Sequence, residues 1–480
     1  MVRLEIPKSD AIVVGSGPNG LAAAIRLARR GWQVTVLEQA ATPGGGVRSA
    51  ELTLPGFVHD VCSSVYPMGV CSPFMRSLPL REHGVEWVIP PTALAHPFED
   101  GTAAVLHNSL GETVAALGED GGAYQSVVGD LVPRWPAFFQ DALAVPRFPR
   151  HPLLMAGFGR RALRSGSSLA KSAFKTERAR GLFAGLAAHS MLPLDKLGTA
   201  AVAITLAVAA HAAGWPMAKG GAQQLTNGLV AYLKSLGGRV MTNCRVDSLE
   251  QLPPVRAVLL DVTPRQLLQI AGGRLPKGYR RKLERYRYGT AAFKVDWALA
   301  GPAPWRAPQC RNAGTLHLGA TLQEICESES RAANEGIADR PFVLFAQPSV
   351  FDASRAPVGK HTAWGYCHVP HAYAGDAQDV AKKIEQQVER FAPGFRDLIL
   401  ARSVLTPAEL EAHNPNLIGG DIGGGSPELG QLFLRPTASR HRTPLPGVYL
   451  CSSSTPPGPG VHGMCGYYAA EAALKDAARQ

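Results

Sequence analysis

The sequence predicts an α/β fold in which one domain is built on a parallel sheet and a second combines a mixed sheet with helices. Two observations support this. A strand–helix–strand unit opens the chain, and similar strands and helices return in the middle and near the C-terminus. With 480 residues, the chain is much longer than the ~100–200 residues of a usual domain. Its hydrophobic fraction of 46% provides ample core for two domains.

The first unit spans residues 10–38. Residues 11–15 (AIVVG) form a short apolar run typical of a buried parallel strand. Residues 21–30 carry apolar side chains at helical spacing, and Gly31 follows as a helix stop. Residues 32–37 (WQVTVL) predict a second strand, which ends at an acidic residue. Together they form a βαβ unit.

Further elements follow in order along the chain. Helices are expected at 197–217, 221–237, 380–391 and from 466 onward, and strands at 239–244, 257–262, 288–299 and 447–451. The first of these helices is uncharged, but it contains His211, Gly214 and Pro216. It therefore predicts a buried helix rather than a membrane span.

The chemistry of the first unit lies in its turn. Gly15, Ser16, Gly17, Pro18, Asn19 and Gly20 form G-x-G-x-x-G between the strand and the helix. Gly15 allows the tight turn, Gly17 admits a pyrophosphate to the backbone, and Gly20 lets the helix pack on the strand. Glu38 ends the second strand, where a carboxylate accepts ribose hydroxyls and repels a 2′-phosphate. The unit therefore predicts a dinucleotide site that disfavours NADP.

A second glycine-rich loop follows this acid. Residues 43–48 (PGGGVR) bring Gly45 and Gly46 to an arginine, Arg48, that can add positive charge beside the diphosphate. A loop of this kind favours FAD over NAD. Near the C-terminus, a strand leads through Ser452 into PGPGVHG, which contains Gly460, Val461 and His462. A helix starting there would direct its N–H groups at the flavin carbonyls.

These motifs together resemble the flavoprotein superfamily that includes phytoene desaturases and monoamine oxidases. The resemblance is greatest to the desaturase-like group named pyridine nucleotide-disulfide oxidoreductase domain-containing protein 2. It is carried by VVGSGPNGLAAA, PGGGVRSAEL, GWPMAKGGAQ, FKVDWAL, NPNLIGGDI and YLCSSSTPPGPGVHGMCGYYAA. It implies a fold of the p-hydroxybenzoate-hydroxylase type with non-covalent FAD. The FAD domain is expected at 1–78, 215–275 and 430–480, interleaved with a substrate domain at 79–214 and 276–429.

The resemblance also completes the list of expected cofactor contacts. Residues 62–66 (CSSVY) look like the loop that runs past the flavin ring, which adds Ser64 and Val65. A backbone contact to adenine is expected at Val246, although the segment after it is shorter than in relatives. The full set is Gly15, Ser16, Gly17, Pro18, Asn19, Gly20, Glu38, Gln39, Gly45, Gly46, Arg48, Ser64, Val65, Val246, Ser452, Gly460, Val461 and His462. No metal site is expected.

Two residues are candidates for catalysis. Lys294 corresponds to a lysine that holds a water beside flavin N5 in amine-oxidase relatives, so it is expected to act as a base or oxygen activator. An exposed structural lysine is the alternative. His462 lies in the loop that faces the flavin, where it is expected to donate to flavin O2 or substrate, or to cap a helix.

The leading hypothesis is a FAD-dependent dehydrogenase or desaturase that takes a hydride from an apolar, isoprenoid-like substrate. Alternatives are a FAD amine oxidase that releases hydrogen peroxide and a non-enzymatic binding protein on the same fold. No second dinucleotide site is expected, since no apolar strand precedes GGDIGGG at 419–425. Electrons are therefore expected to leave to oxygen or a quinone.

Charge and cysteine usage limit the other partners. The formal net charge is +11, but no nucleic-acid module accompanies it. Basic residues concentrate at 159–180, where Leu163, Leu169 and Phe174 are interleaved with them, so this stretch is a candidate for peripheral membrane contact. The eight cysteines form no CxxC pair. These features predict a cytoplasmic or membrane-peripheral protein, and oligomerisation stays open.

Overall fold

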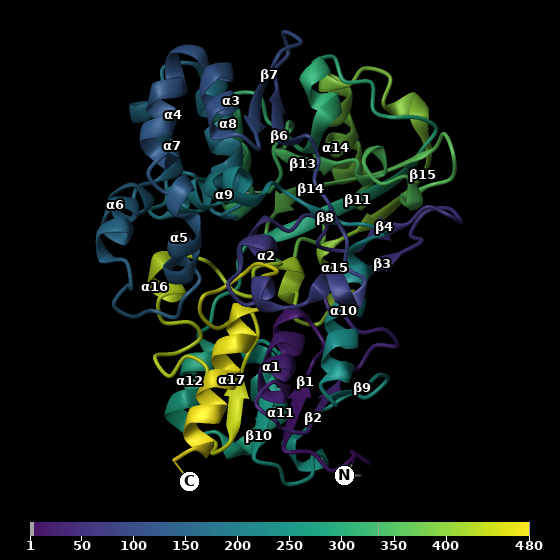
Figure 1. Ribbon diagram of the computed structural model, residues 1–480. Coiled ribbons are helices and arrows are strands. Elements are labelled where there is room, and N and C mark those ends of the chain that lie inside the picture. The colour runs from purple at the N-terminus through teal and green to yellow at the C-terminus, as the bar shows by residue number, and fades with distance from the viewer. Residues whose placement is uncertain (1–3, 335, 480) are drawn as a thin grey trace.

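The computed structural model describes residues 4–334 and 336–479. A parallel sheet with its helices occupies one half of the molecule, next to both termini (Figure 1). A second, mixed sheet and a group of helices occupy the other half. The α/β fold class predicted from the sequence is confirmed.

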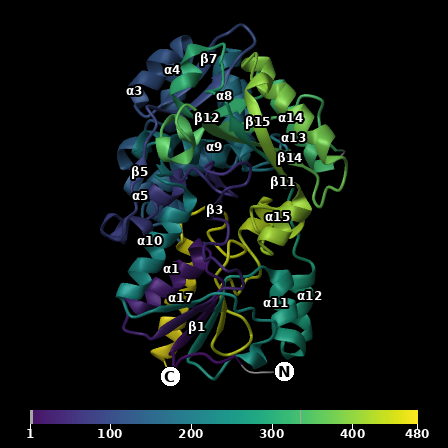
Figure 2. The same cartoon turned by 90° about the vertical axis from the view of Figure 1, so that its right-hand side faces the viewer.

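The parallel sheet is assembled from distant parts of the chain. Across the sheet its strands are β16 (Val448–Leu450), β10 (Ala257–Leu260), β1 (Ala11–Val14), β2 (Val34–Leu37) and β9 (Arg239–Met241). All four pairings are parallel. Helices cover both faces, as Figure 2 shows: α1 (Pro18–Ala28), α10 (Ala222–Ser235) and α17 (Met464–Ala477) on one, α11 (Pro264–Ala271) and α12 (Lys277–Glu284) on the other.

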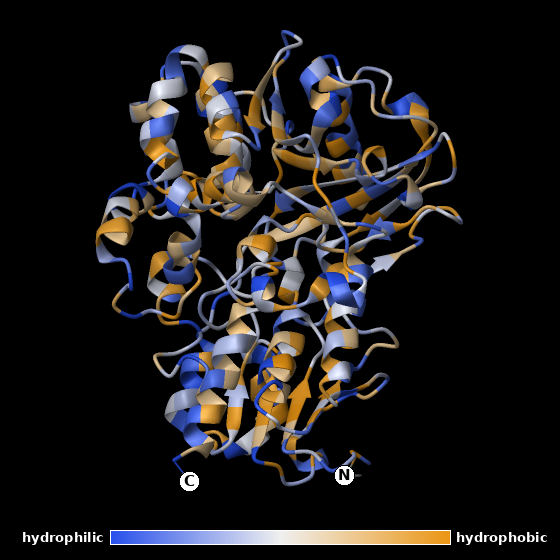
Figure 3. Cartoon of the chain, in the orientation of Figure 1, coloured by the Kyte–Doolittle hydropathy of each residue, from blue (hydrophilic) through white to orange (hydrophobic). Residues whose placement is uncertain are grey.

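Strand β1 shows why its residues are apolar throughout. Ala11 and Val13 pack with α1, whereas Ile12 and Val14 pack with α11 and α12. A strand covered by helices on both faces has no side open to water, so the alternation of polar and apolar residues disappears. The apolar character of these central strands is visible in Figure 3.

The second sheet is mixed. Across the sheet its strands are β15 (Ile399–Leu405), β11 (Ala291–Leu299), β14 (His361–Val369), β13 (Val343–Ala346), β12 (Ala313–Leu318), β6 (Thr92–Pro97) and β7 (Ala103–His107). Only the β12–β6 pairing is parallel. Helix α14 (Ala377–Phe391) packs on one face through Val380, Ile384 and Val388. The opposite face is turned towards the parallel sheet.

The remaining helices form a layer beside the second sheet or connect its strands. They are α2 (Pro67–Cys71), α3 (Leu110–Ala116), α4 (Gly121–Val128), α5 (Trp135–Ala142), α6 (Pro152–Ala162), α7 (Gly166–Ala173), α8 (Glu177–Ala188), α9 (Thr199–Ala213), α13 (Leu322–Asn334), α15 (Pro407–His413) and α16 (Leu429–Leu432). The short strands β3 (Ser49–Ala50) and β4 (His59–Asp60) pair with each other, as do β5 (Trp87–Val88) and β8 (Met217–Ala218).

Several boundaries differ from those predicted. Helix α1 begins at Pro18, because proline suits the first helical turn. Strand β9 ends at Met241 rather than 244, since Asn243 adopts a left-handed backbone with φ 53°. Strand β11 begins at Ala291, three residues later than expected.

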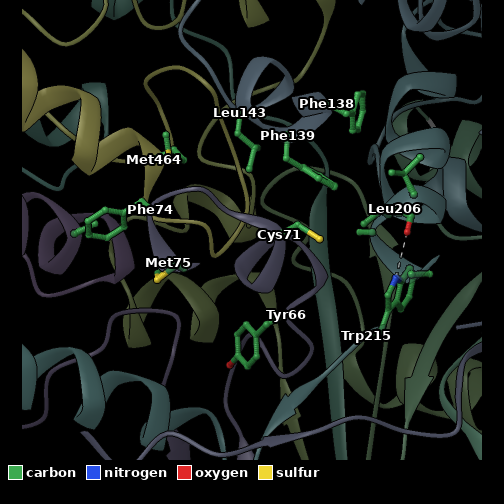
Figure 4. Packing of buried hydrophobic residues seen from close by; sticks show 14 of the residues in the cluster. Tyr66, Cys71, Phe74, Met75, Phe138, Phe139, Leu143, Leu206, Trp215 and Met464 are labelled. Atoms are coloured by element: carbon green, nitrogen blue, oxygen red, sulfur yellow. Dashed lines mark hydrogen bonds between the residues drawn. The ribbon is translucent and has the colours of Figure 1, made fainter. Parts of the chain in front are cut away.

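One core cluster joins the two halves. Figure 4 shows Tyr66 and Met75 from the N-terminal part, Phe139 of α5, Met464 of α17 and Trp215 within this cluster. The Trp215 indole donates to the carbonyl of residue 206 at 3.3 Å. Because the apolar contacts run through both halves, the halves are held as one packed body.

Asp60 on β4 ties the segments between the halves together. Its Oδ1 accepts hydrogen bonds from the Ser49 hydroxyl at 2.8 Å and from the N–H of Ala222, at the start of α10, at 2.7 Å. Its Oδ2 accepts from the Ser64 hydroxyl at 2.6 Å and forms an ion pair with Arg355 at 2.6 Å. Asp60 and Arg355 are both 1% exposed, so this charge pair is fully buried.

We expect Arg355→Met to lower the free energy of unfolding by about 3–5 kcal/mol, because it leaves the buried Asp60 carboxylate without its counter-charge. Urea denaturation followed by circular dichroism measures the loss. The matched control is Glu86→Gln, which breaks the exposed ion pair to Lys219 and should change stability little. Similar stabilities for the two variants would contradict the importance of the buried pair.

Candidate functional site

One large cavity lies between the two sheets. It has a volume of about 1120 Å³, slightly above the ~300–1,000 Å³ usual for ligand pockets. At one end it is lined by the turn after β1, and at the other by apolar residues of the helical layer, among them Met155, Phe158 and Leu206. The cavity is therefore large enough for a dinucleotide together with a second molecule.

The turn after β1 provides a site for an anion. Gly15 has φ 98°, and a side chain on Gly20 would clash with the Gly15 carbonyl oxygen at 2.1 Å. Helix α1 starts at its N-cap, Gly17, without a side-chain cap. Pro18 has no N–H and the Gly20 N–H is bonded to Asp261, so the N–H of Asn19 and the positive end of the helix dipole are left for a negatively charged group.

Glu38 lies at the end of β2, beside this turn. Its Oε2 accepts hydrogen bonds from the N–H of Ser16 at 3.0 Å and from the Ser16 hydroxyl. Its Oε1 accepts from the N–H of Ala40 at 2.9 Å. A carboxylate has about four acceptor positions, and three are used here, so Glu38 retains capacity for about one hydroxyl of a ribose.

The second glycine-rich loop packs tightly on the first. Gly45 has φ 56°, and a side chain there would lie 3.0 Å from Gly17 Cα. Arg48 was expected to face the diphosphate directly. In the structure its Nε donates to the Gly45 carbonyl and its Nη2 to the His413 carbonyl, both at 2.9 Å. Arg48 therefore fixes the shape of the loop while it lines the cavity.

Asp261 is a site residue that the motifs did not identify. It follows β10, and its Oδ2 accepts the N–H of Gly20 at 2.9 Å. Burial raises the pKa of this carboxyl to about 7, although the Gly20 hydrogen bond opposes the shift. A signal did exist, because an acid directly after a buried parallel strand stands at the edge where such sheets bind ligands.

The other end of the nucleotide site is formed by the chain's C-terminal loop. Gly460, Val461 and His462 line the cavity. The Nδ1 of His462 accepts the N–H of Met464 at 3.0 Å and so caps the start of α17. Burial lowers the pKa of His462 to about 4, which keeps the ring neutral with its proton on Nε2. That Nε2 is buried without a partner among the described residues.

Lys294 lies in the cavity wall on β11. This strand is flanked by β15 and β14, so the lysine is not on the edge of the sheet, and it is 4% exposed. Its Nζ donates to the Asp60 carbonyl oxygen at 3.0 Å and to the carboxylate of Asp296. The other oxygen of Asp296 faces His59 Nδ1 at 3.5 Å. A buried polar chain thus leads away from the cavity at Lys294.

Most of the residues expected from the sequence meet in this cavity. Those in its wall are Gly15, Ser16, Gly17, Pro18, Asn19, Glu38, Gln39, Gly45, Gly46, Arg48, Ser64, Val65, Val246, Lys294, Gly460, Val461 and His462. Two lie behind it. Gly20 contacts Asp261, and the Ser452 hydroxyl donates to the Val262 carbonyl oxygen at 2.7 Å. The residues present fit a dinucleotide: bare glycine backbone, the start of a helix and a carboxylate at the end of β2 surround one cavity.

Comparisons with known proteins agree with this geometry. Residues 13–76 match the family model described as an NAD(P)-binding Rossmann-like domain. The chain is 27% identical to mouse pyridine nucleotide-disulfide oxidoreductase domain-containing protein 2, over 98% of this chain and 94% of that protein. It is 25% identical to the lycopene-forming phytoene desaturase of Pseudescherichia vulneris, over 96% and 98%. The chain is an oxidoreductase.

Solved structures show the same fold at lower identity. An oxidoreductase from Methanosarcina mazei superposes with a TM-score of 0.66 at 15% identity, covering 97% of this chain and 99% of its own. Putrescine oxidase superposes with a TM-score of 0.63 at 16% identity, covering 98% and 99%. This oxidoreductase therefore shares its architecture with amine oxidases as well as its ancestry with desaturases.

Within residues 4–334 and 336–479, no cluster of three or more histidine, cysteine or acidic side chains is arranged to hold a metal ion. In the same part of the chain no helix has both the length and the apolar character needed to cross a bilayer.

The raised pKa of Asp261 predicts a pH dependence. The folded protein holds this proton up to a pH of about 7, whereas the unfolded chain releases it near 3.8. The contribution of Asp261 to stability is therefore full below pH 3.8 and is lost as the pH rises to about 7. We expect Asp261→Asn, which keeps an acceptor for Gly20, to raise the melting temperature at pH 8 by a few degrees.

The measurement is thermal melting of wild type and variant at pH 5 and pH 8. The difference in melting temperature between the two proteins should be larger at pH 8. An equal difference at both values would contradict a buried titrating carboxyl at this position.

Proposed function

We propose that this oxidoreductase is a FAD-dependent dehydrogenase or desaturase that acts on an apolar, isoprenoid-like molecule. The observation that carries the proposal is the single cavity in which a dinucleotide site and an apolar chamber meet at Lys294. The phytoene desaturase relatives support the choice of substrate, since phytoene is an apolar isoprenoid.

FAD, held without a covalent bond, supplies the hydride acceptor when it is bound. The start of α1 receives its diphosphate, Glu38 receives a ribose, and the two glycine loops let the backbone approach. The C-terminal loop with His462 provides a neutral N–H near the ring. The apolar walls exclude water from the reacting carbon.

Loss of a hydride from one carbon of a desaturase substrate must be matched by loss of a proton from its neighbour. In this proposal Lys294 Nζ, which lies in the cavity wall, passes one of its protons to the Asp296 carboxylate as it takes up the proton from the substrate carbon. Asp296 and His59 continue the path, and His59 Nε2 is 2.8 Å from the Thr53 hydroxyl on a partly exposed segment. The electrons then pass to oxygen or a quinone.

The amine-oxidase alternative rests on the same lysine and on the shared fold. It differs in its product, because an amine oxidase releases hydrogen peroxide when oxygen takes the electrons. The non-enzymatic alternative loses its support, because the homologues are oxidoreductases.

The purified protein is expected to be yellow and to lose its flavin absorbance under nitrogen when an apolar isoprenoid is added. Lys294→Met should slow either this bleaching or the later reoxidation by oxygen by about a hundredfold, the usual value of a positioned acid–base group. Stopped-flow absorbance separates the two steps.

Lys219→Met is the matched control, because Lys219 forms an exposed ion pair away from the cavity. Unchanged rates of both steps in Lys294→Met would remove the lysine from the proposal. Bleaching by an amine panel together with release of hydrogen peroxide would favour the amine oxidase instead.

For peripheral membrane contact we propose a different surface from the one expected from the sequence. Leu169 and Phe174, expected to be exposed among the basic residues, are 3% and 2% exposed. Exposed apolar side chains gather instead on the loop after α5, on α6, before α9 and around α16, which lie on the same side of the molecule (Figure 1). They are Phe148, Leu153, Leu163, Leu197, Phe433 and Leu434, and we call them the apolar rim.

Three members of the apolar rim, Leu163, Leu197 and Phe433, also line the cavity. Exposed basic residues stand among the rim residues, namely Arg147, Arg150, Arg160 and Lys196. Apolar side chains within a basic surface suit an anionic bilayer, from which an apolar substrate would enter the cavity directly.

We expect the protein to sediment with vesicles that contain phosphatidylglycerol and much less with pure phosphatidylcholine. The double variant Phe148→Ser, Leu153→Ser should weaken this binding tenfold or more, because each side chain contributes roughly 1.5–3 kcal/mol on burial. Val358→Ser, which alters an exposed apolar residue outside the rim, is the control. Equal binding by all three proteins would contradict the surface.

A further inference from the structure

On the face that lines the cavity, the second sheet carries a row of side chains of which three are polar: His317, Tyr366 and Lys294. In the register of the sheet, His317 on β12 lies opposite Leu344 on β13, Leu344 opposite Tyr366 on β14, and Tyr366 opposite Lys294 on β11. Residues directly opposite one another share a face of the sheet. Three strand spacings, about 14 Å, separate the two ends of this row.

His189 covers the end of the row away from Lys294. It follows α8, and its Nε2 lies 2.9 Å from the Nε2 of His317. His189 and Tyr366 both line the cavity and are partly exposed to it, whereas His317 is completely buried behind them. The Trp215 ring packs edge-on against His189 at 5.8 Å and limits its movement.

The pairing of the two imidazoles fixes where their protons lie. Burial lowers the pKa of His189 to about 3 and that of His317 well below its usual value, so both rings are neutral. One Nε2 must therefore donate and the other accept. The Nδ1 of His317 is buried without a partner among the described residues.

A buried N–H without an acceptor is disfavoured, whereas an unused acceptor is better tolerated. His317 is therefore protonated on Nε2 and donates to His189. It follows that His189 carries its own proton on Nδ1. That Nδ1–H has no acceptor among the described residues, and it belongs to a side chain that is open to the cavity.

Tyr366 presents a second free donor. Its ring is stacked beside Trp364, with ring centroids 6.1 Å apart, and its hydroxyl has no hydrogen-bond partner among residues 4–334 and 336–479. Burial raises the pKa of this hydroxyl above its usual value, so it stays protonated. The apolar chamber thus contains two fixed donors. The Tyr366 hydroxyl stands one strand spacing from Lys294, and the His189 N–H stands two to three strand spacings from it.

We propose that His189 and Tyr366 recognise an oxygen atom of the substrate, which is therefore an apolar molecule with a hydroxyl or carbonyl group rather than a pure hydrocarbon. The inference rests on the proposed function, since it names the substrate class of the same cavity. A hydrocarbon would leave both donors unsatisfied in an apolar environment. A site with fixed polar groups discriminates strongly against an analogue that lacks the matching group.

The test compares farnesene, farnesol and farnesal, which share an isoprenoid chain and differ in oxygen. Binding is measured by quenching of tryptophan fluorescence, because Trp215 and Trp364 both line the cavity. We expect the holoenzyme to bind farnesol or farnesal at least tenfold more tightly than farnesene.

Isosteric variants separate recognition from packing. Tyr366→Phe removes only the hydroxyl. His189→Gln keeps a group at the Nε2 position for His317 but removes the Nδ1 donor, whereas His189→Asn keeps a donor near Nδ1. Tyr366→Phe and His189→Gln should each lose about tenfold in affinity for the oxygenated compound, and their affinity for farnesene should not change. His189→Asn should lose less.

Tyr279→Phe is the control, since this buried tyrosine lies outside the cavity wall and its hydroxyl has no hydrogen-bond partner among the described residues. Three outcomes would overturn the inference. The wild type could bind the three compounds with equal affinity, it could fail to bind the oxygenated ones, or the variants could lose affinity equally for all three. Flavin bleaching is recorded in parallel. Selective binding of the oxygenated compounds without bleaching would support the substrate class while the proposed dehydrogenation fails.

Discussion

The structure depends on the buried carboxylate of Asp60. Its side chain joins β3, the cavity loop at Ser64 and the start of α10, and it neutralises Arg355 from the connection between β13 and β14. Its main-chain carbonyl also holds Lys294 at 3.0 Å. One residue therefore aligns the loop expected beside the cofactor with the lysine expected to act on the substrate. Because these contacts are buried, they hold the two groups more rigidly than contacts exposed to water would.

The two halves contribute different chemistry to the cavity. The parallel sheet supplies backbone groups at a turn, where glycines leave room and a helix start favours an anion. The mixed sheet supplies side chains, since paired strands place a row of residues on one face at regular spacing. The helical layer closes the chamber with apolar groups and carries the apolar rim at its outer edge. The binding of cofactor, substrate and membrane that we propose thus falls to separate elements.

Sequence reasoning worked best where function depends on local geometry. The turn at Gly15–Gly20 and the acid Glu38 are separated by few residues, so spacing alone predicts their placement beside one another. Asp261 was missed because its proximity to Gly20 spans 241 positions. The membrane expectation at 159–180 placed Leu169 and Phe174 on the surface, although tertiary packing buries both in the core beside α8 and α9.

The sequence by itself determined the βαβ unit, the preference for a dinucleotide and the resemblance to flavoproteins, because these follow from short-range patterns of glycine, apolar and acidic residues. Only the tertiary structure decided that Lys294 is buried between Asp60 and Asp296, and that His189 meets His317. Apart from Lys294 and Asp296, which share one face of β11, these contacts join residues that no period or spacing relates. They arise when sheets and helices pack, so they exist only in the folded chain.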